Sequence, residues 1–75
     1  MIDTEGRHPG TAQVARWFDY SHLSGPARDT AAAVHDLAAE VVDTLPDGPE
    51  LTAGLRKLLE AKDCFVRATI AKENP

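Results

Sequence analysis

Apolar residues recur at spacings of three and four over residues 27–45, and acidic residues fill the opposite side. Ser24 precedes this segment as the predicted N-cap, and Pro26 suits a first helical turn because its missing N–H has no partner there. The pattern predicts an amphipathic helix over residues 27–45. Its apolar stripe consists of Ala27, Thr30, Ala31, Val34, Leu37, Ala38, Val41, Val42 and Leu45.

A second helix is predicted after the Pro-Asp-Gly-Pro sequence of residues 46–49, which ends the first one. Asp47 or Gly48 can cap this helix, which we expect to continue to about Lys72. Because the loop is short, the two helices should be antiparallel neighbours. The fold expected for residues 11–75 is thus an all-α antiparallel two-helix hairpin. The second apolar stripe consists of Leu51, Leu55, Leu58, Leu59, Phe65, Val66, Thr69 and Ile70.

The N-terminal part differs in character from the hairpin. Residues 1–10 are polar and contain glycine and proline, which predicts a flexible arm and no secretory signal. Residues 11–18 predict two helical turns with Thr11 as N-cap. So short a helix is not stable alone and must dock on something. We expect Trp17 and Phe18 to dock it on a neighbouring subunit; docking on its own hairpin is the alternative.

The small size of the chain favours self-association. A core in a chain below about 80 residues rarely supplies more than ~3–5 kcal/mol. Cys64 is the single cysteine of 75 residues, so no intramolecular disulfide can form. The histidines and this cysteine lack paired ligand spacing, which predicts no metal site. Two helices cannot bury a whole stripe each, and the exposed remainder is typical of an interface. We therefore expect a homo-oligomer.

Charge and motifs exclude several function classes. The net charge of -4 argues against a protein that coats DNA or RNA, because phosphate neutralisation needs a basic surface. No apolar run approaches the ~18 residues of a membrane span. The sequence has no Gly-rich phosphate loop, nucleophile elbow or HExxH motif, so we expect neither an enzyme nor a cofactor. The pattern Arg56, Glu60, Asp63 and Arg67 predicts a solvated stripe of ion pairs.

Three basic residues lie on or beside the apolar stripes. Lys62 is at the centre of the second stripe, where a charge is costly unless it is satisfied. Its amine either meets an anion in a pocket between subunits or extends to water. Arg28 and His35 are seven residues apart, so they share one edge of the first helix. Cations at an interface edge suit phosphate groups; ordinary solvated side chains, or a structural histidine, are the alternatives.

Aromatic residues and one further arginine complete the candidate ligand site. Tyr20 precedes the first long helix, and aromatic rings stack on nucleobases with ~1–3 kcal/mol each. We expect a ligand role for Tyr20 and a hydrophobic clasp for Trp17 and Phe18. Arg67 lies late on the second helix next to Asp63, where it forms either a salt bridge or a forked contact to phosphate.

These residues resemble a known family. The Asp-Tyr-Ser-His-Leu-Ser sequence of residues 19–24, an alanine-rich helix, Leu45-Pro46 and a second helix with Phe-Val-Arg-Ala at residues 65–68 are similar to the phage anti-CBASS cyclic-nucleotide sponges. A hairpin of this kind also occurs in some anti-Thoeris sponges. The resemblance covers residues 19–70. It implies a hexamer without enzymatic activity that binds cyclic dinucleotides between protomers, and cyclic trinucleotides at separate pockets in some members.

The resemblance also implies roles for single residues. Tyr20 matches the family's tyrosine that stacks on ligand bases, and Arg67 matches its arginine that contacts the larger rings. The family's phosphate-binding lysine lies fifteen residues after the tyrosine, where this chain has His35. Histidine is only partly protonated near neutral pH, so phosphate affinity should be lower or depend on Arg28 or Lys62.

The function expected from the resemblance is sequestration of cyclic oligonucleotide immune messengers in the host bacterial cytoplasm, which blocks CBASS signalling against phage. The alternative is a helical interaction module whose exposed stripe binds a host protein.

Overall fold

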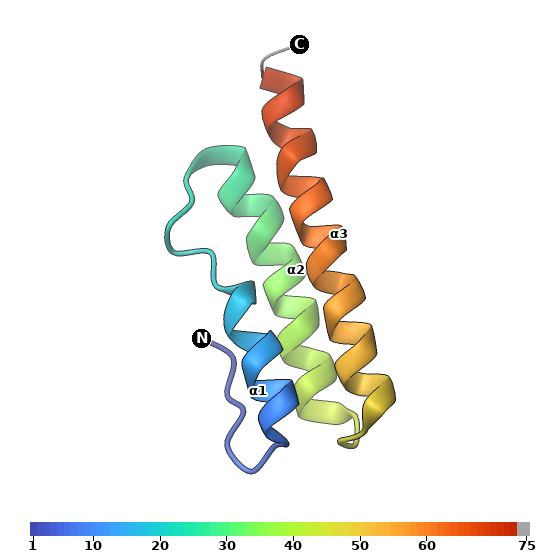
Figure 1. Ribbon diagram of the computed structural model, residues 1–75. Coiled ribbons are helices and arrows are strands. Elements are labelled where there is room, and N and C mark those ends of the chain that lie inside the picture. Colours follow the sequence, from blue (N-terminus) through green and yellow to red (C-terminus); the bar gives the residue numbers. More distant parts are fainter. Residues whose placement is uncertain (74–75) are drawn as a thin grey trace.

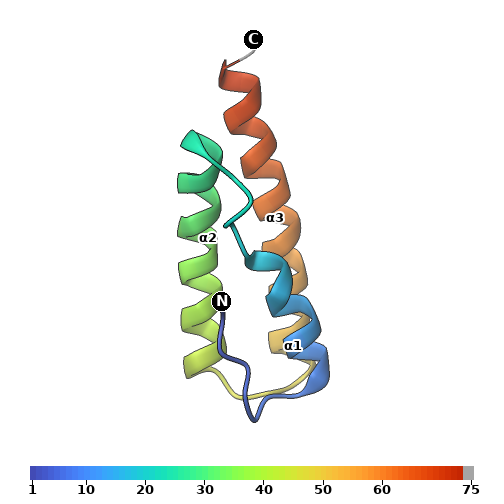
Figure 2. The same ribbon diagram turned by 90° about the vertical axis from the view of Figure 1, so that its left-hand side faces the viewer.

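The computed structural model describes residues 1–73 and confirms the all-α hairpin. Two long helices, α2 (Gly25–Thr44) and α3 (Pro49–Glu73), lie side by side and antiparallel (Figure 1). A short helix, α1 (Pro9–Ala15), continues into the 3-10 helix η1 (Arg16–Phe18) and packs against the hairpin, as Figure 2 shows from the side. No helix within residues 1–73 is long and apolar enough to cross a membrane.

Both long helices begin close to their predicted starts. Ser24 is the N-cap of α2 as predicted, although its side chain makes no capping hydrogen bond. The first helical residue, Gly25, has a φ of +63°, a left-handed conformation that glycine adopts without steric cost. The helix ends at Thr44, one residue before the predicted end, and α3 begins at Pro49. The extended turn at Leu45 and the two prolines around residues 46–49 prevent the helices from merging.

The start of α1 differs from the prediction. Thr11 is not the N-cap, because the helix begins two residues earlier at Pro9. His8 occupies the cap position, and its Nδ1 atom accepts a hydrogen bond of 3.0 Å from the Gly10 N–H. Proline is favourable at the first helical position, and an imidazole nitrogen replaces the usual capping oxygen. Thr11 is therefore fully buried inside the helix, with no partner for its hydroxyl.

The core lies between the hairpin and the N-terminal helices. Phe18 is completely buried there, whereas Trp17 stays 57% exposed beneath the Arg16 guanidinium. The predicted aromatic clasp thus consists of Phe18, and it closes on its own hairpin rather than on a neighbouring subunit. The physical reason is that α2 and α3 together offer a groove that buries the whole ring. The apolar core consists of Ile2, Val14, Ala15, Phe18, Val34, Ala38, Val42, Leu51 and Leu55.

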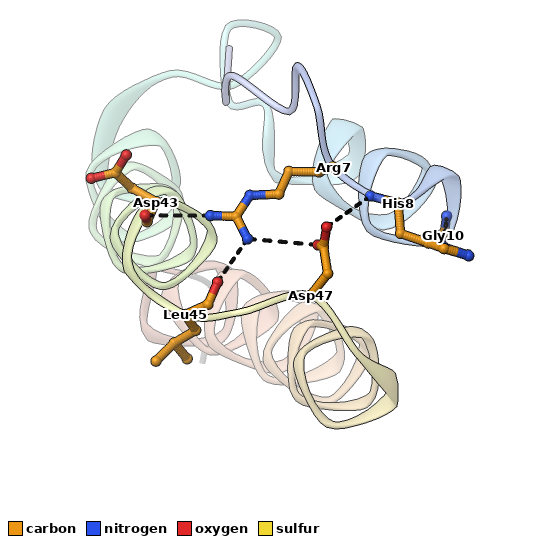
Figure 3. A network of polar contacts seen from close by, with 6 residues as sticks. All are labelled: Arg7, His8, Gly10, Asp43, Leu45 and Asp47. Carbon is orange, nitrogen blue, oxygen red and sulfur yellow. Dashed lines mark hydrogen bonds and ion pairs between the residues drawn. The ribbon is translucent and has the colours of Figure 1, made fainter.

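The predicted arm is tied to the α2–α3 loop by a polar network (Figure 3). The Arg7 guanidinium donates hydrogen bonds to the carbonyl oxygens of Leu45, at 2.7 Å, and Asp43, at 3.3 Å. It also lies 3.6 Å from the Asp47 carboxylate, which accepts a hydrogen bond of 3.2 Å from the His8 backbone N–H. Arg7 thus satisfies carbonyl groups at the C-terminal end of α2 that have no helical partner.

Candidate functional site

Three of the predicted ligand residues meet beside the first turns of α2. The Tyr20 ring packs edge-to-face against His35, with ring centroids 5.1 Å apart and an interplanar angle of 74°. The Arg28 guanidinium carbon lies 5.0 Å from the centroid of the same ring. We call Tyr20, Arg28 and His35 the aromatic site. The loop supplies the tyrosine, and α2 supplies the arginine and the histidine, two turns apart.

A compact turn positions Tyr20 in the loop between η1 and α2. The Asp19 carboxylate accepts hydrogen bonds from the Ser21 hydroxyl, at 2.8 Å, and from the Ser21 N–H, at 3.2 Å. These two bonds hold the pKa of Asp19 below its ordinary value. The Leu23 N–H donates to the Tyr20 carbonyl at 3.0 Å, which closes a second turn. The loop therefore holds its shape largely by local hydrogen bonds.

His35 presents an unpaired nitrogen within this site. Its Nδ1 atom lies 3.2 Å from the Asp36 carboxylate. A carboxylate only accepts, so Nδ1 carries a proton and donates it. The other ring nitrogen, Nε2, is buried without a hydrogen-bond partner among residues 1–73. In the neutral ring Nε2 is an acceptor, and protonation converts it into a donor that suits phosphate.

Lys62 is bound inside its own subunit. The residue is only 5% exposed, and its amine donates hydrogen bonds to the backbone carbonyls of Trp17, at 2.7 Å, and Asp19, at 3.2 Å. This arrangement differs from the predicted extension to water, because the amine is buried against its own chain. It caps the C-terminal end of η1 and fixes the start of the loop that carries Tyr20. Within residues 1–73 no carboxylate forms an ion pair with it.

Arg67 and Lys62 line a small hollow on the other side of this loop. The hollow has a volume of about 180 Å³ and is also lined by His22, Leu23 and Asp63. The predicted ion pair between Arg67 and Asp63 is not among the ion pairs of the described residues; the guanidinium instead lies 3.5 Å from the Cys64 sulfur. The wider stripe predicted from Arg56 to Arg67 likewise forms no ion pair within residues 1–73. We call the hollow lined by Lys62, Arg67, His22, Leu23 and Asp63 the lysine hollow.

The sequence did not indicate that the loop between η1 and α2 contributes residues to both the aromatic site and the lysine hollow. His22 reaches the lysine hollow from the same Asp-Tyr-Ser-His-Leu-Ser segment that carries Tyr20. Its contribution was missed because a single histidine in a loop has no periodicity that would indicate its neighbours. The acceptors of Lys62 were missed for a related reason, since they are backbone carbonyls and carry no side-chain signature.

A larger hollow than the lysine hollow lies at the opposite end of the molecule. It has a volume of about 550 Å³ between the start of α1 and the first turns of α3, and none of the five predicted ligand residues lines it. Its walls include His8, Thr52 and Arg56, of which His8 is already engaged as a helix cap. Among residues 1–73, no three histidine, cysteine or acidic side chains are grouped so that they could hold a metal ion.

Because comparisons with known proteins found no match, the function proposed for this chain rests on the sequence, the fold and the site. No protein-family model, curated protein or solved structure matches this chain.

Proposed function

We propose that the protein is a non-enzymatic sponge that sequesters cyclic oligonucleotides, namely cyclic dinucleotides and also cyclic trinucleotides. The observation that carries this proposal is the convergence of Tyr20, Arg28 and His35 at one place. An aromatic ring beside an arginine and a histidine combines the two features that a nucleotide needs, a stacking surface and N–H donors for phosphate.

Binding at the aromatic site requires a rearrangement of Arg28. Its guanidinium covers the Tyr20 ring in the free protein, so a nucleobase replaces it on the ring face. The released guanidinium then turns toward the adjacent phosphate, which it binds through a fork of two N–H groups. His35 strengthens the phosphate contact when its ring is protonated. The ligand's base and phosphate thus engage neighbouring side chains simultaneously.

The lysine hollow provides a second place for a phosphate of a larger ring. The Lys62 ammonium has three N–H groups, of which two bind the carbonyls of Trp17 and Asp19. Lys62 also lines the hollow, beside Arg67 and His22, and in this proposal its third N–H binds the phosphate. A buried ammonium without a carboxylate partner gains strongly from a nearby anion.

Sequestration requires tight binding and abundance, not catalysis. We propose that the sponge acts as a homo-oligomer, a hexamer as in the family it resembles, in the host bacterial cytoplasm. There it would withhold cyclic messengers from CBASS effectors. The ligand would leave the protein chemically unchanged.

The direct test is isothermal titration calorimetry against a panel of cyclic di- and trinucleotides, with linear dinucleotides as controls. We expect sub-micromolar affinity for a cyclic member, and chromatography of the heated complex should recover that ligand intact. Tyr20→Ala should weaken binding at least about fivefold, since one stacked base contributes ~1–3 kcal/mol. Trp17→Ala is the matched control, because Trp17 is an exposed aromatic outside the site. Absence of binding to every cyclic member would refute the proposal.

One observation favours a second candidate function. The side of the hairpin away from α1 exposes large apolar residues, Leu37, Leu45 and Phe65 among them. Such a surface also fits a module that binds a helix of a host protein. A stable complex with a host protein, together with no response to nucleotides, would favour this alternative.

A further inference from the structure

An apolar groove runs between α2 and α3 and is not lined by any residue of α1 or η1. It has a volume of about 250 Å³, and nearly all of its lining is apolar. Leu37, on α2, and Leu45, directly after its end, are 48% and 45% exposed there. Members of this lining include Leu37, Val41, Leu45, Leu51, Gly54 and Leu58. Isolated soluble domains rarely leave such a continuous apolar strip in water.

The strip continues along α3 beyond the groove. Phe65 follows Leu58 by seven residues, two helical turns, and therefore lies on the same face. It is 51% exposed, so the apolar surface extends over much of the length of the hairpin. A partner for this surface must therefore be elongated and apolar along its own length.

Charges at the two outer edges of the strip indicate which partner fits. Glu40 follows Leu37 by three residues on α2, and Lys57 directly precedes Leu58 on α3. Leu37 and Leu58 both line the groove, and both charged residues are displaced from them toward the α2–α3 loop. Glu40 and Lys57 are thus nearly level, one on each edge. Both are exposed, and neither has an ion-pair partner within residues 1–73.

We infer that this surface is the interface with a second copy of the chain. The two copies pack face to face, related by a half-turn about an axis that runs along the groove. This operation places α2 of each copy over α3 of the other, so that four helices alternate in direction as in an antiparallel bundle. Glu40 of each copy then meets Lys57 of the second copy, once at each edge.

A second copy fits better than an unrelated helix because the surface complements itself. The half-turn pairs Glu40 with Lys57 of the second copy at nearly the same level, although the α3 side of the groove also carries Glu50 closer to the loop, and it places the leucines over one another. It also sets Gly54, which has nothing within 4 Å of the position of an added Cβ, approximately opposite Val41 of the second copy. The inference rests on the oligomer of the proposed function and does not depend on its ligand. A two-fold pair is also a building unit for a hexamer of dihedral symmetry.

The test is sedimentation equilibrium of the full chain and of charge-reversed variants. Glu40→Lys and Lys57→Glu each place like charges at both edges, so each should raise the dissociation constant of the pair at least about fivefold. The double variant restores opposite charges and should return within about twofold of the unmodified protein. Glu60→Lys and Arg56→Glu are matched reversals of exposed residues outside the groove lining and should change little.

Two results would overturn the inference: a chain that remains monomeric at about 100 µM, well above the dissociation constants of stable pairs, or an oligomer that is indifferent to both reversals and their combination. Leu37→Asp adds a second variant, because it should dissociate the pair while circular dichroism remains helical. The outcome is distinct from that of the ligand proposal. Rescue by the double variant without nucleotide binding would keep the interface and remove the sponge, whereas nucleotide binding by a charge-indifferent oligomer would do the reverse.

Discussion

The two sides of the α2–α3 hairpin carry similar apolar residues but differ in what covers them. On one side, α1 and η1 cover the hairpin, and Phe18 of η1 is completely buried in a core that includes Val42 and Leu55. On the other side, Leu37 and Phe65 remain about half exposed. The apolar pattern of each helix is therefore wider than one covering layer can bury. The difference teaches that the covered side holds the core of the fold, whereas the open side leaves the apolar surface on which the proposed pairing depends.

The largest contrast should come from truncating one leucine on each side. Leu55→Ala leaves a cavity in the covered core and should lower the free energy of unfolding by about 2–5 kcal/mol. Leu37→Ala, at a half-exposed position, should cost less than about 1 kcal/mol in dilute protein. Urea unfolding monitored by circular dichroism measures both values. Equal losses at low concentration would contradict the distinction between the two sides.

Substitution of Lys62 should show that the stability of the covered side depends on buried hydrogen bonds as well as on apolar contacts. Lys62→Met keeps the length of the side chain but leaves the carbonyls of Trp17 and Asp19 without their donor. We expect a loss of about 1–3 kcal/mol, the usual cost of buried groups left unpaired. Lys72→Met is the matched control because Lys72 is exposed near the end of α3. A Lys62→Met variant as stable as this control would show that water replaces the amine.

A smaller effect is expected where the N-terminal arm closes over the covered side. Arg7→Ala removes the hydrogen bonds to Leu45 and Asp43 and the contact with Asp47. Because the Arg7 side chain is 21% exposed, the cost should be about 0.5–1.5 kcal/mol. Hydrogen exchange should accelerate at the C-terminal end of α2 and in residues 1–8, while Arg56→Ala should leave both unchanged.

The smallest expected effect concerns acidification of the loop beside Tyr20. The Ser21 hydroxyl and N–H hold the pKa of Asp19 below its ordinary value. A lowered folded-state pKa adds stability to this turn above the ordinary pKa, and this stability is lost as the pH falls through the folded-state pKa, below about 4. The Ser21 amide signal in NMR should follow this titration, and Asp19→Asn should abolish it. A carboxyl that titrates above its ordinary value would contradict the turn.

Periodicity predicted the helices because burial of one face imposes a repeat of about 3.6 residues. It also brought Arg28 and His35 to one edge of α2, where the structure adds Tyr20. The start of α1 was not predictable in this way, because an imidazole cap at His8 has no common sequence signature. The role of Lys62 escaped prediction because its acceptors are backbone atoms 43 and 45 residues away.

That separation makes the position of Tyr20 depend on nearly the whole chain. The start of the loop is joined to α3 through the Lys62 amine, so its final position depends on the packing of the last helix. Local opening of this joint would release the loop at a lower free energy than global unfolding requires. The proposed ligand, once bound to Tyr20, would select the closed form and so stabilise the whole fold by mass action. Saturation with such a ligand would therefore slow hydrogen exchange not only in the loop but in the distant turns of α3.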